Sequence, residues 1–330
     1  MSKNRIYFFD NLKGVLIFLV VLGHYILPIH SISDPMNGVY EFIYLFHMPL
    51  FIFISGFFSK SIFKNGNLRI EKIISLVVLV GLFQISLTLI ERYDNFDINY
   101  LLDFGSAPWY LVSLICYYLL IPFFIRVHPV VAIAGGFLIS LGINCFDAAG
   151  DFLAISRTLV FLPFFLLGFY CGKEEFLKIK NIRIISFSPA VLVLLLIVFL
   201  ATGGILGSDQ YIIYGNTAYK GSFITGMGLR LFVFTLAAII SLGVICLTPR
   251  NKTFLATIGE RTLQIYVLHR LIRPFLDSFG LFDLAIFADP VIGVLFAVVL
   301  SILITLLCAL RILKKPFDLL LNMDWKRLVR

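Results

Sequence analysis

Long apolar runs recur along the whole chain, each close to the roughly 20 residues that a helix needs to cross a bilayer. Short polar segments separate them. Because a backbone inside a membrane must satisfy its hydrogen bonds within its own segment, we expect these runs to be helices. The sequence therefore predicts an all-α, polytopic transmembrane bundle of about ten helices in a single domain over residues 1–330. The predicted spans are 12–30, 42–59, 73–90, 108–125, 129–145, 155–172, 184–203, 226–248, 254–275 and 288–311.

The composition argues against a soluble protein. Hydrophobic residues make up 60% of the chain and charged residues 14%, against roughly 45–50% and 25% in soluble domains. The net charge of +8 comes from basic clusters between apolar runs, which set membrane topology and need no nucleic acid partner. Most of the 27 Lys and Arg residues fall on the side of the N-terminus. We therefore expect a multi-pass protein of the cell (cytoplasmic) membrane with both termini in the cytoplasm.

Metal and cofactor signals are absent from the sequence. The five cysteines are scattered and show no CxxC or Cys/His spacing, so we expect no metal site and no permanently bound cofactor. The first apolar run lacks a small-residue cleavage site, and we expect it to be a retained helix. Since the loops are short, any chemistry is expected within the helical bundle or at its faces.

The first predicted helix carries polar residues on one stripe. Lys13 and His24 are separated by eleven positions, which turn a helix about 20° beyond three full turns and span roughly 16 Å. Asp10 falls within about 40° of the direction of His24 by the same arithmetic. We expect Asp10 to pair with Lys13, as residues three apart on a helix do.

His24 would lie beyond the middle of the membrane, where an imidazole is costly unless it faces protein or water. Two interpretations remain open. One is a histidine hydrogen-bonded between helices, and the other is a group that exchanges protons near neutral pH. The shared stripe favours the second. Because Asp10 is about 21 Å away along the axis, any partner of His24 must come from another helix.

The segment Phe9–Gly14, followed by Leu22-Gly23-His24, resembles the opening of the acyltransferase 3 family, closest to its fucose 4-O-acetylase-like branch. The basic residue on the first helix of this family is usually Arg, whose guanidinium can form two parallel hydrogen bonds. Lys13 supplies a single ammonium charge instead. The resemblance rests on an ordered set of motifs over nearly the whole chain. The further motifs are Phe46–Phe57, Arg69 with Lys72, Pro108–Leu111, Arg157–Gly168 and Gly259–His269.

This resemblance implies transfer of an acyl group, expected to be acetyl, from cytoplasmic acyl-CoA to a hydroxyl of a cell-surface or exported glycan. The implied partners are acyl-CoA, a glycan or glycolipid acceptor and membrane lipids. His24 is the catalytic candidate, as a general base or as a covalent acyl carrier. Small residues such as Ser55 would leave room for the pantetheine arm, or would pack helices closely. The candidates for donor binding are Lys13, Asp10, Arg69, Lys72 and Ser55.

The candidates for acceptor binding lie toward the predicted outer half. Trp109 and Tyr110 would stack on a sugar or belong to an interfacial aromatic belt. Arg157 would bind an acidic acceptor or reach to the interface from a helix end. His47 and His269 complete this set. The alternative function is a proton-coupled transporter of a small molecule or lipid-linked glycan, with His24 as proton relay.

Overall fold

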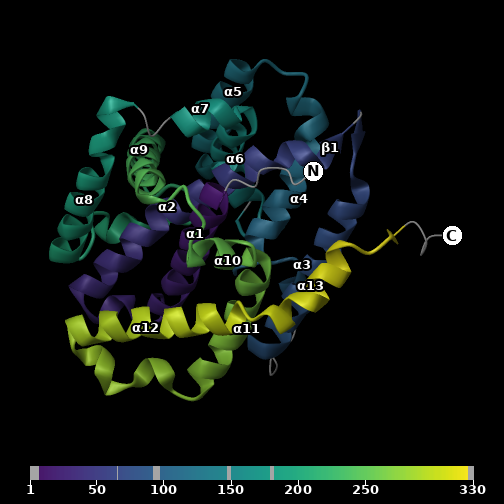
Figure 1. Ribbon diagram of the computed structural model, residues 1–330. Helices are drawn as coiled ribbons and strands as arrows, with labels where there is room; N and C mark the ends of the chain where they lie inside the picture. The colour runs from purple at the N-terminus through teal and green to yellow at the C-terminus, as the bar shows by residue number, and fades with distance from the viewer. Residues whose placement is uncertain (1–6, 65, 92–96, 147–149, 179–181, 326–330) are drawn as a thin grey trace. The chain divides into compact units, whose positions relative to one another are not determined.

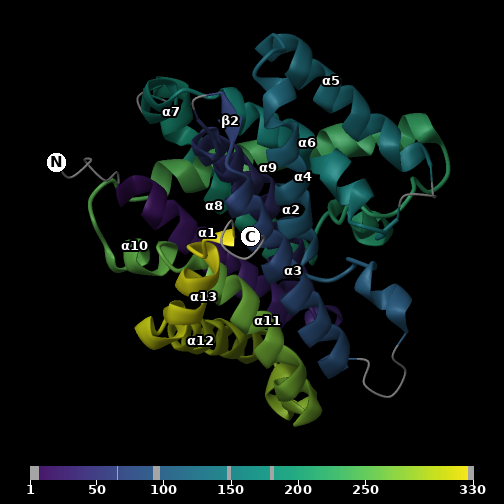
Figure 2. The same ribbon diagram turned by 90° about the vertical axis from the view of Figure 1, so that its right-hand side faces the viewer.

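The computed structural model describes residues 7–64, 66–91, 97–146, 150–178 and 182–325 (Figures 1 and 2). This part of the chain is almost entirely helical, so the all-α prediction is confirmed. Its strands are the two-residue β1 (Phe63–Lys64) and β2 (Asn67–Leu68), which pair antiparallel. The helices are α1 (Tyr7–Ile26), α2 (Asp34–Ser59), α3 (Ile70–Glu91), α4 (Trp109–Phe124), α5 (Pro129–Gly142), α6 (Ile155–Tyr170), α7 (Lys173–Lys178), α8 (Ser188–Thr202), α9 (Phe223–Leu247), α10 (Phe254–Gly259), α11 (Thr262–Ser278), α12 (Pro290–Cys308) and α13 (Lys314–Leu321).

Every predicted span coincides with helical structure. Within the described residues, six helices are long and apolar enough, by length and composition, to cross a membrane: α1, α2, α3, α8, α9 and α12. α2 begins at Asp34, eight positions before the predicted span, because Asp34 and Pro35 suit the first turn of a helix. The total number of crossings and the cytoplasmic position of both termini stay predictions.

The predicted span 254–275 is wrong as a single helix. The structure divides it into α10 and α11, with Arg261 outside helical geometry at φ −120° and ψ 19°. The Arg261 guanidinium donates a hydrogen bond to the carbonyl of Ala309, just beyond α12. Gln264 Nε2 donates to Cys308 O at 2.6 Å and to Leu310 O at 3.1 Å. Both side chains thus donate to carbonyls at and just beyond the end of α12, where a helix leaves its last carbonyls without partners of its own.

α12 exposes aliphatic side chains and buries small or polar ones. On α12, Leu295 and Leu303 are both 59% exposed, whereas Ala297, Ser301 and Thr305 are buried. Small and hydroxyl residues let membrane helices approach closely, and an exposed aliphatic face suits contact with lipid chains. This inside-out distribution agrees with a membrane protein.

The described chain forms two compact units, each built from segments distant in sequence. The first contains residues 1–48, 177–208 and 235–317, and the second contains 49–176, 209–234 and 318–330. The chain passes between the units several times. The prediction of a single domain over residues 1–330 stays a prediction.

Candidate active site

α1 carries the predicted polar stripe as one unbroken helix over Tyr7–Ile26, so the sequence-based spacing of Lys13 and His24 applies. Lys13 Nζ lies 2.8 Å from Asp10 Oδ1, which confirms the predicted pair. Asp10 is buried, whereas Lys13 is partly exposed. The ammonium group therefore remains accessible at the N-terminal end of the helix.

α10 packs against this end of α1 with backbone touching backbone (Figures 1 and 2). A Cβ added at Gly14 would lie 2.2 Å from the carbonyl oxygen of Leu255. A Cβ added at Gly259 would lie 1.8 Å from the carbonyl oxygen of Asp10. Gly14 thus serves close packing and leaves no room for a pantetheine arm at this point.

Asn11 fixes the segment that leads into α10. Its side chain is fully buried, and Nδ2 donates to Pro249 O at 2.9 Å and to Asn251 O at 2.7 Å. Thr253 Oγ1 donates to Asn11 Oδ1 at 2.7 Å. The sequence analysis missed this residue. The available signal was an amide directly before the predicted first span, next to a membrane interior where an unsatisfied polar group is costly.

α11 brings a second imidazole, that of His269, beside His24. The rings of His24 and His269 lie 5.2 Å apart, centroid to centroid, with an angle of 49° between their planes. His269 is fully buried, and its Nδ1 lies 2.7 Å from the carbonyl oxygen of Ile265, one turn earlier. Because a carbonyl only accepts, Nδ1 carries the proton of a neutral His269 ring. His24 itself is partly exposed.

Further basic groups surround His24 in the same unit. Arg270, which is 6% exposed, and Arg273 act electrostatically on His24, as does His47 of α2. His47 is also buried, and its Nδ1 contacts Ile43 O at 2.6 Å. The sequence analysis missed both arginines. Charged residues within a predicted span are the signal that could have found them.

The predicted acceptor residues Trp109 and Arg157 meet in the second unit. The Arg157 guanidinium lies 5.4 Å above the Trp109 ring, whose face also stacks on Phe161 at 5.3 Å. Arg157 Nη2 is 3.3 Å from Asp151 Oδ1, and Nη1 donates to Gly105 O at 3.0 Å. Arg157 is the third residue of α6 and is buried, so its side chain packs within the second unit, and its position at the membrane interface stays a prediction.

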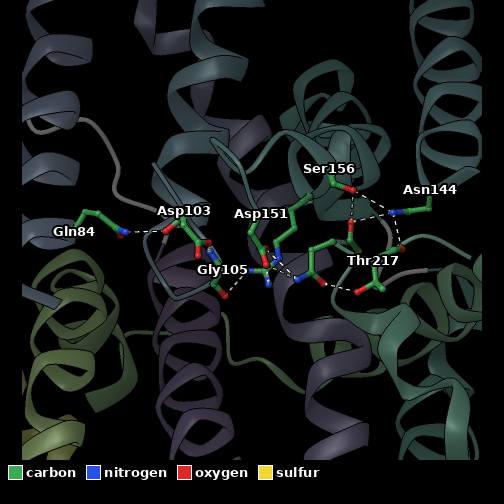
Figure 3. A network of polar contacts seen from close by, with 10 residues as sticks. Gln84, Asp103, Gly105, Asn144, Asp151, Ser156 and Thr217 are labelled. Carbon is green, nitrogen blue, oxygen red and sulfur yellow. Dashed lines mark hydrogen bonds and ion pairs between the residues drawn. The ribbon is translucent and has the colours of Figure 1, made fainter. Parts of the chain in front are cut away.

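Asp151 and Gly105, which both contact Arg157, belong to a network of polar contacts that joins three loops (Figure 3). Asn216 Nδ2 donates to both carboxylate oxygens of Asp151 at 3.0 Å. Asn144 Nδ2 donates to Thr217 O at 2.9 Å and to Ser156 Oγ at 3.1 Å. These contacts support a role of Arg157 in holding the loops, and acceptor binding by Arg157 stays a prediction.

Ser55 and Tyr110 lie together, although the sequence analysis places them in different groups. Their hydroxyl oxygens are 2.7 Å apart, and Ser55 Oγ also donates to Phe51 O at 2.8 Å. The adjacent Gly56 packs on α6, because an added Cβ would lie 2.1 Å from Phe165 O. Small residues at this point of α2 thus permit close helix packing.

Arg69 and Lys72 follow the short β1–β2 hairpin at the start of α3. Arg69 N donates to Ile62 O at 2.9 Å, and Lys72 N donates to Arg69 O at 3.0 Å. The Arg69 side chain is exposed and that of Lys72 is partly exposed. Both lie in the second unit and Lys13 in the first, so their joint contribution to donor binding stays a prediction.

Apolar helices of membrane-spanning length, with a histidine pair and arginines enclosed among them, define a multi-pass membrane protein with a polar interior site. The family described as "Acyltransferase domain" (Acyl_transf_3) matches residues 6–310. The chain belongs to this acyltransferase 3 family and is a membrane acyltransferase by membership. The suspected resemblance is confirmed.

Two relatives are both called nodulation protein NolL. The protein from Sinorhizobium fredii is 30% identical over 189 residues, which cover 51% of this chain and 49% of the relative. The protein from Mesorhizobium japonicum is 40% identical over 62 residues, which cover 18% and 17%. The chain thus spans at most about half the length of the curated relatives it matches. No solved structure matches it.

Proposed function

We propose that this protein is a membrane O-acyltransferase that moves an acyl group, expected to be acetyl, from cytoplasmic acyl-CoA to a hydroxyl of a cell-surface or exported glycan. The observation that carries the proposal is the imidazole of His24, beside that of His269, on the same unbroken helix as Lys13. Membership of the acyltransferase family supports acyl transfer. The donor, the acceptor and the location in the cell membrane are parts of the proposal.

The chemistry assigned to His24 is general base catalysis. A sugar hydroxyl is a weak nucleophile at neutral pH, so His24 takes its proton as the oxygen attacks the thioester carbonyl. The tetrahedral intermediate then collapses with loss of the CoA thiolate, which takes up the proton and leaves as the thiol. The competing route forms an acyl-histidine first and passes the acyl group to the hydroxyl in a second step.

Donor binding needs positive charge for the phosphates of CoA. Lys13 supplies it on α1, where Asp10 holds the ammonium group at 2.8 Å. Arg69 and Lys72 supply two further charges at the start of α3. Each of these residues is proposed to contribute to acyl-CoA binding from the cytoplasmic side, since basic loops favour that side of a membrane.

The test uses the full chain in nanodiscs with radiolabelled acetyl-CoA and a panel of glycans and glycolipids. We expect label to enter one class of acceptor. His24→Ala should lower the rate by about 10²- to 10⁴-fold, which is the usual contribution of a general base, with an unchanged unfolding temperature. Absence of both acetyl transfer and slow CoA release would reject the enzyme. Acyl transfer at full rate in the folded variant would remove His24 from the mechanism. Label retained on His24 after acid quench would select the covalent route.

Lys13→Ala separates donor binding from chemistry. Loss of a charged contact of about 1.5 kcal/mol or more raises the KM for acyl-CoA by about tenfold or more, and kcat should change little. Lys220→Ala is the matched control, because it removes an exposed lysine from a loop of the second unit. An unchanged donor KM in the Lys13 variant contradicts the assigned role.

A further inference from the structure

Two buried nitrogen atoms, one on each ring of the histidine pair, have no hydrogen-bond partner among the described residues. They are Nδ1 of His24 and Nε2 of His269. Their rings come from neighbouring helices and lie 5.2 Å apart. An N–H···N bond of about 2.9 Å between two imidazoles places their centroids about 5 Å apart. The observed separation therefore fits such a bond once the rings rotate so that the N–H of one imidazole points at the free nitrogen of the other.

The direction of that bond follows from the surroundings of His269. Its Nδ1–H is used by the carbonyl of Ile265 at 2.7 Å, so Nε2 of the neutral ring is an acceptor. Tyr25 OH donates to the backbone carbonyl of His269 at 3.3 Å, which ties this turn of α11 to α1. A buried acceptor without a donor is costly, and Nδ1–H of His24 supplies the donor.

We propose that His269 is the positioning residue of His24. It accepts a hydrogen bond from His24 Nδ1–H and thereby leaves Nε2 of His24 as the basic nitrogen that the acceptor hydroxyl meets. This inference rests on the proposed acyl transfer and replaces the sequence-based assignment of His269 to acceptor binding. When Nε2 of His24 takes the hydroxyl proton, the imidazolium stays bound to His269 through the same Nδ1–H.

The charges of the other groups around His24 explain why a neutral imidazole, and not a carboxylate, can orient its ring. Within the described part of the chain, the groups that act electrostatically on His24 are His269, Arg270, Arg273 and His47. All of them are neutral or cationic. In catalytic triads a carboxylate orients the histidine; here the nitrogen of a second imidazole takes that position without adding a buried charge.

Kinetics of two variants test the assignment. His269→Phe keeps a planar ring and removes the acceptor, and we expect kcat to fall by about 10- to 100-fold, as for other groups that orient a histidine. The KM for the acceptor should stay within about twofold. His269→Gln offers an amide oxygen that accepts the same hydrogen bond, so it should recover most of the lost rate. Thr305→Val is the control, since this buried hydroxyl donates its hydrogen bond to Ser301 O of its own helix. A raised acceptor KM with unchanged kcat, or equal losses in the Phe and Gln variants, would overturn the proposal.

A spectroscopic readout does not depend on the reaction. The chain has five histidines, so ¹⁵N-histidine spectra of the full chain in nanodiscs can be assigned by single substitutions. We expect His24 to be protonated at Nδ1 in the unmodified protein and to shift toward the Nε2–H form in His269→Phe. The same His24 tautomer in both proteins would refute positioning by His269. The expected shift without any acyl transfer would refute the proposed function alone.

Discussion

The Gly259→Ala substitution tests the close packing of α10 against the end of α1 that carries Asp10 and Lys13. A Cβ at this position would lie 1.8 Å from the carbonyl oxygen of Asp10 and 3.0 Å from Gly14 N. Carbon atoms normally stay about 3.5 Å from such neighbours, so α10 would have to retreat by about 1.5 Å. The obstructing atoms belong to backbone, which cannot rotate away as a side chain does.

The expected cost follows from overpacking, which typically destabilises a protein by about 1–3 kcal/mol. Thermal unfolding in nanodiscs should therefore begin a few degrees to about ten degrees lower. Because the displaced helix lies beside Asp10 and Lys13, the KM for acyl-CoA should rise as well. The measurement is an unfolding curve together with donor kinetics on the same preparation.

Gly81→Ala provides the matched control. Gly81 also lies inside a helix, α3, but an added Cβ would meet no atom within 4 Å. Alanine is the better helix former by about 1 kcal/mol, so this variant should be neutral or slightly more stable. If Gly259→Ala unfolded at the same temperature as Gly81→Ala, the close approach of α10 to α1 would be refuted.

The remaining predictions concern buried polar side chains. Asn11→Leu removes three hydrogen bonds from the loop between α9 and α10 and should destabilise the protein by about 1–3 kcal/mol; an unchanged unfolding midpoint would contradict the described loop. Gln264→Leu leaves the carbonyl of Cys308 at the end of α12 without its side-chain donor, with a cost of similar size, and hydrogen exchange there should quicken; equal exchange rates would argue against the cap. Arg157→Lys keeps the charge but loses the planar group above Trp109. Its expected signature is altered tryptophan fluorescence and reduced stability, and an unchanged spectrum would exclude the stacking.

The features of this protein that depend on residues close in sequence were predictable from helix geometry. The stripe of Asp10, Lys13 and His24 needs only the 100° rotation per residue of an α-helix, and the Asp10–Lys13 ion pair follows directly. The positions of the long apolar helices follow from the length of each apolar run. These features depend on residues close in sequence, which the chain displays without any knowledge of packing.

The partner of His24 was not predictable in the same way. The 5.2 Å approach of His269 depends on which helices adjoin and on how each is rotated, and apolar runs of similar composition carry little of that information. The break at Arg261 was missed for the same reason, since its guanidinium bonds to Ala309 O, 48 residues later. Interactions over such separations become visible only when the helices are in place.

The divided segment α10–α11 contacts both ends of α1. α10 packs on the Lys13 end through Gly259, and α11 packs on the His24 end through His269. The two helices adjoin at Glu260 and Arg261, and that junction is itself held to the end of α12. A substitution that displaces α10 can therefore also shift the imidazoles of His24 and His269. In the Gly259→Ala variant, the KM for acyl-CoA and the kcat should therefore change together. Lys13→Ala leaves the backbone contact of α10 intact and should change the donor KM alone.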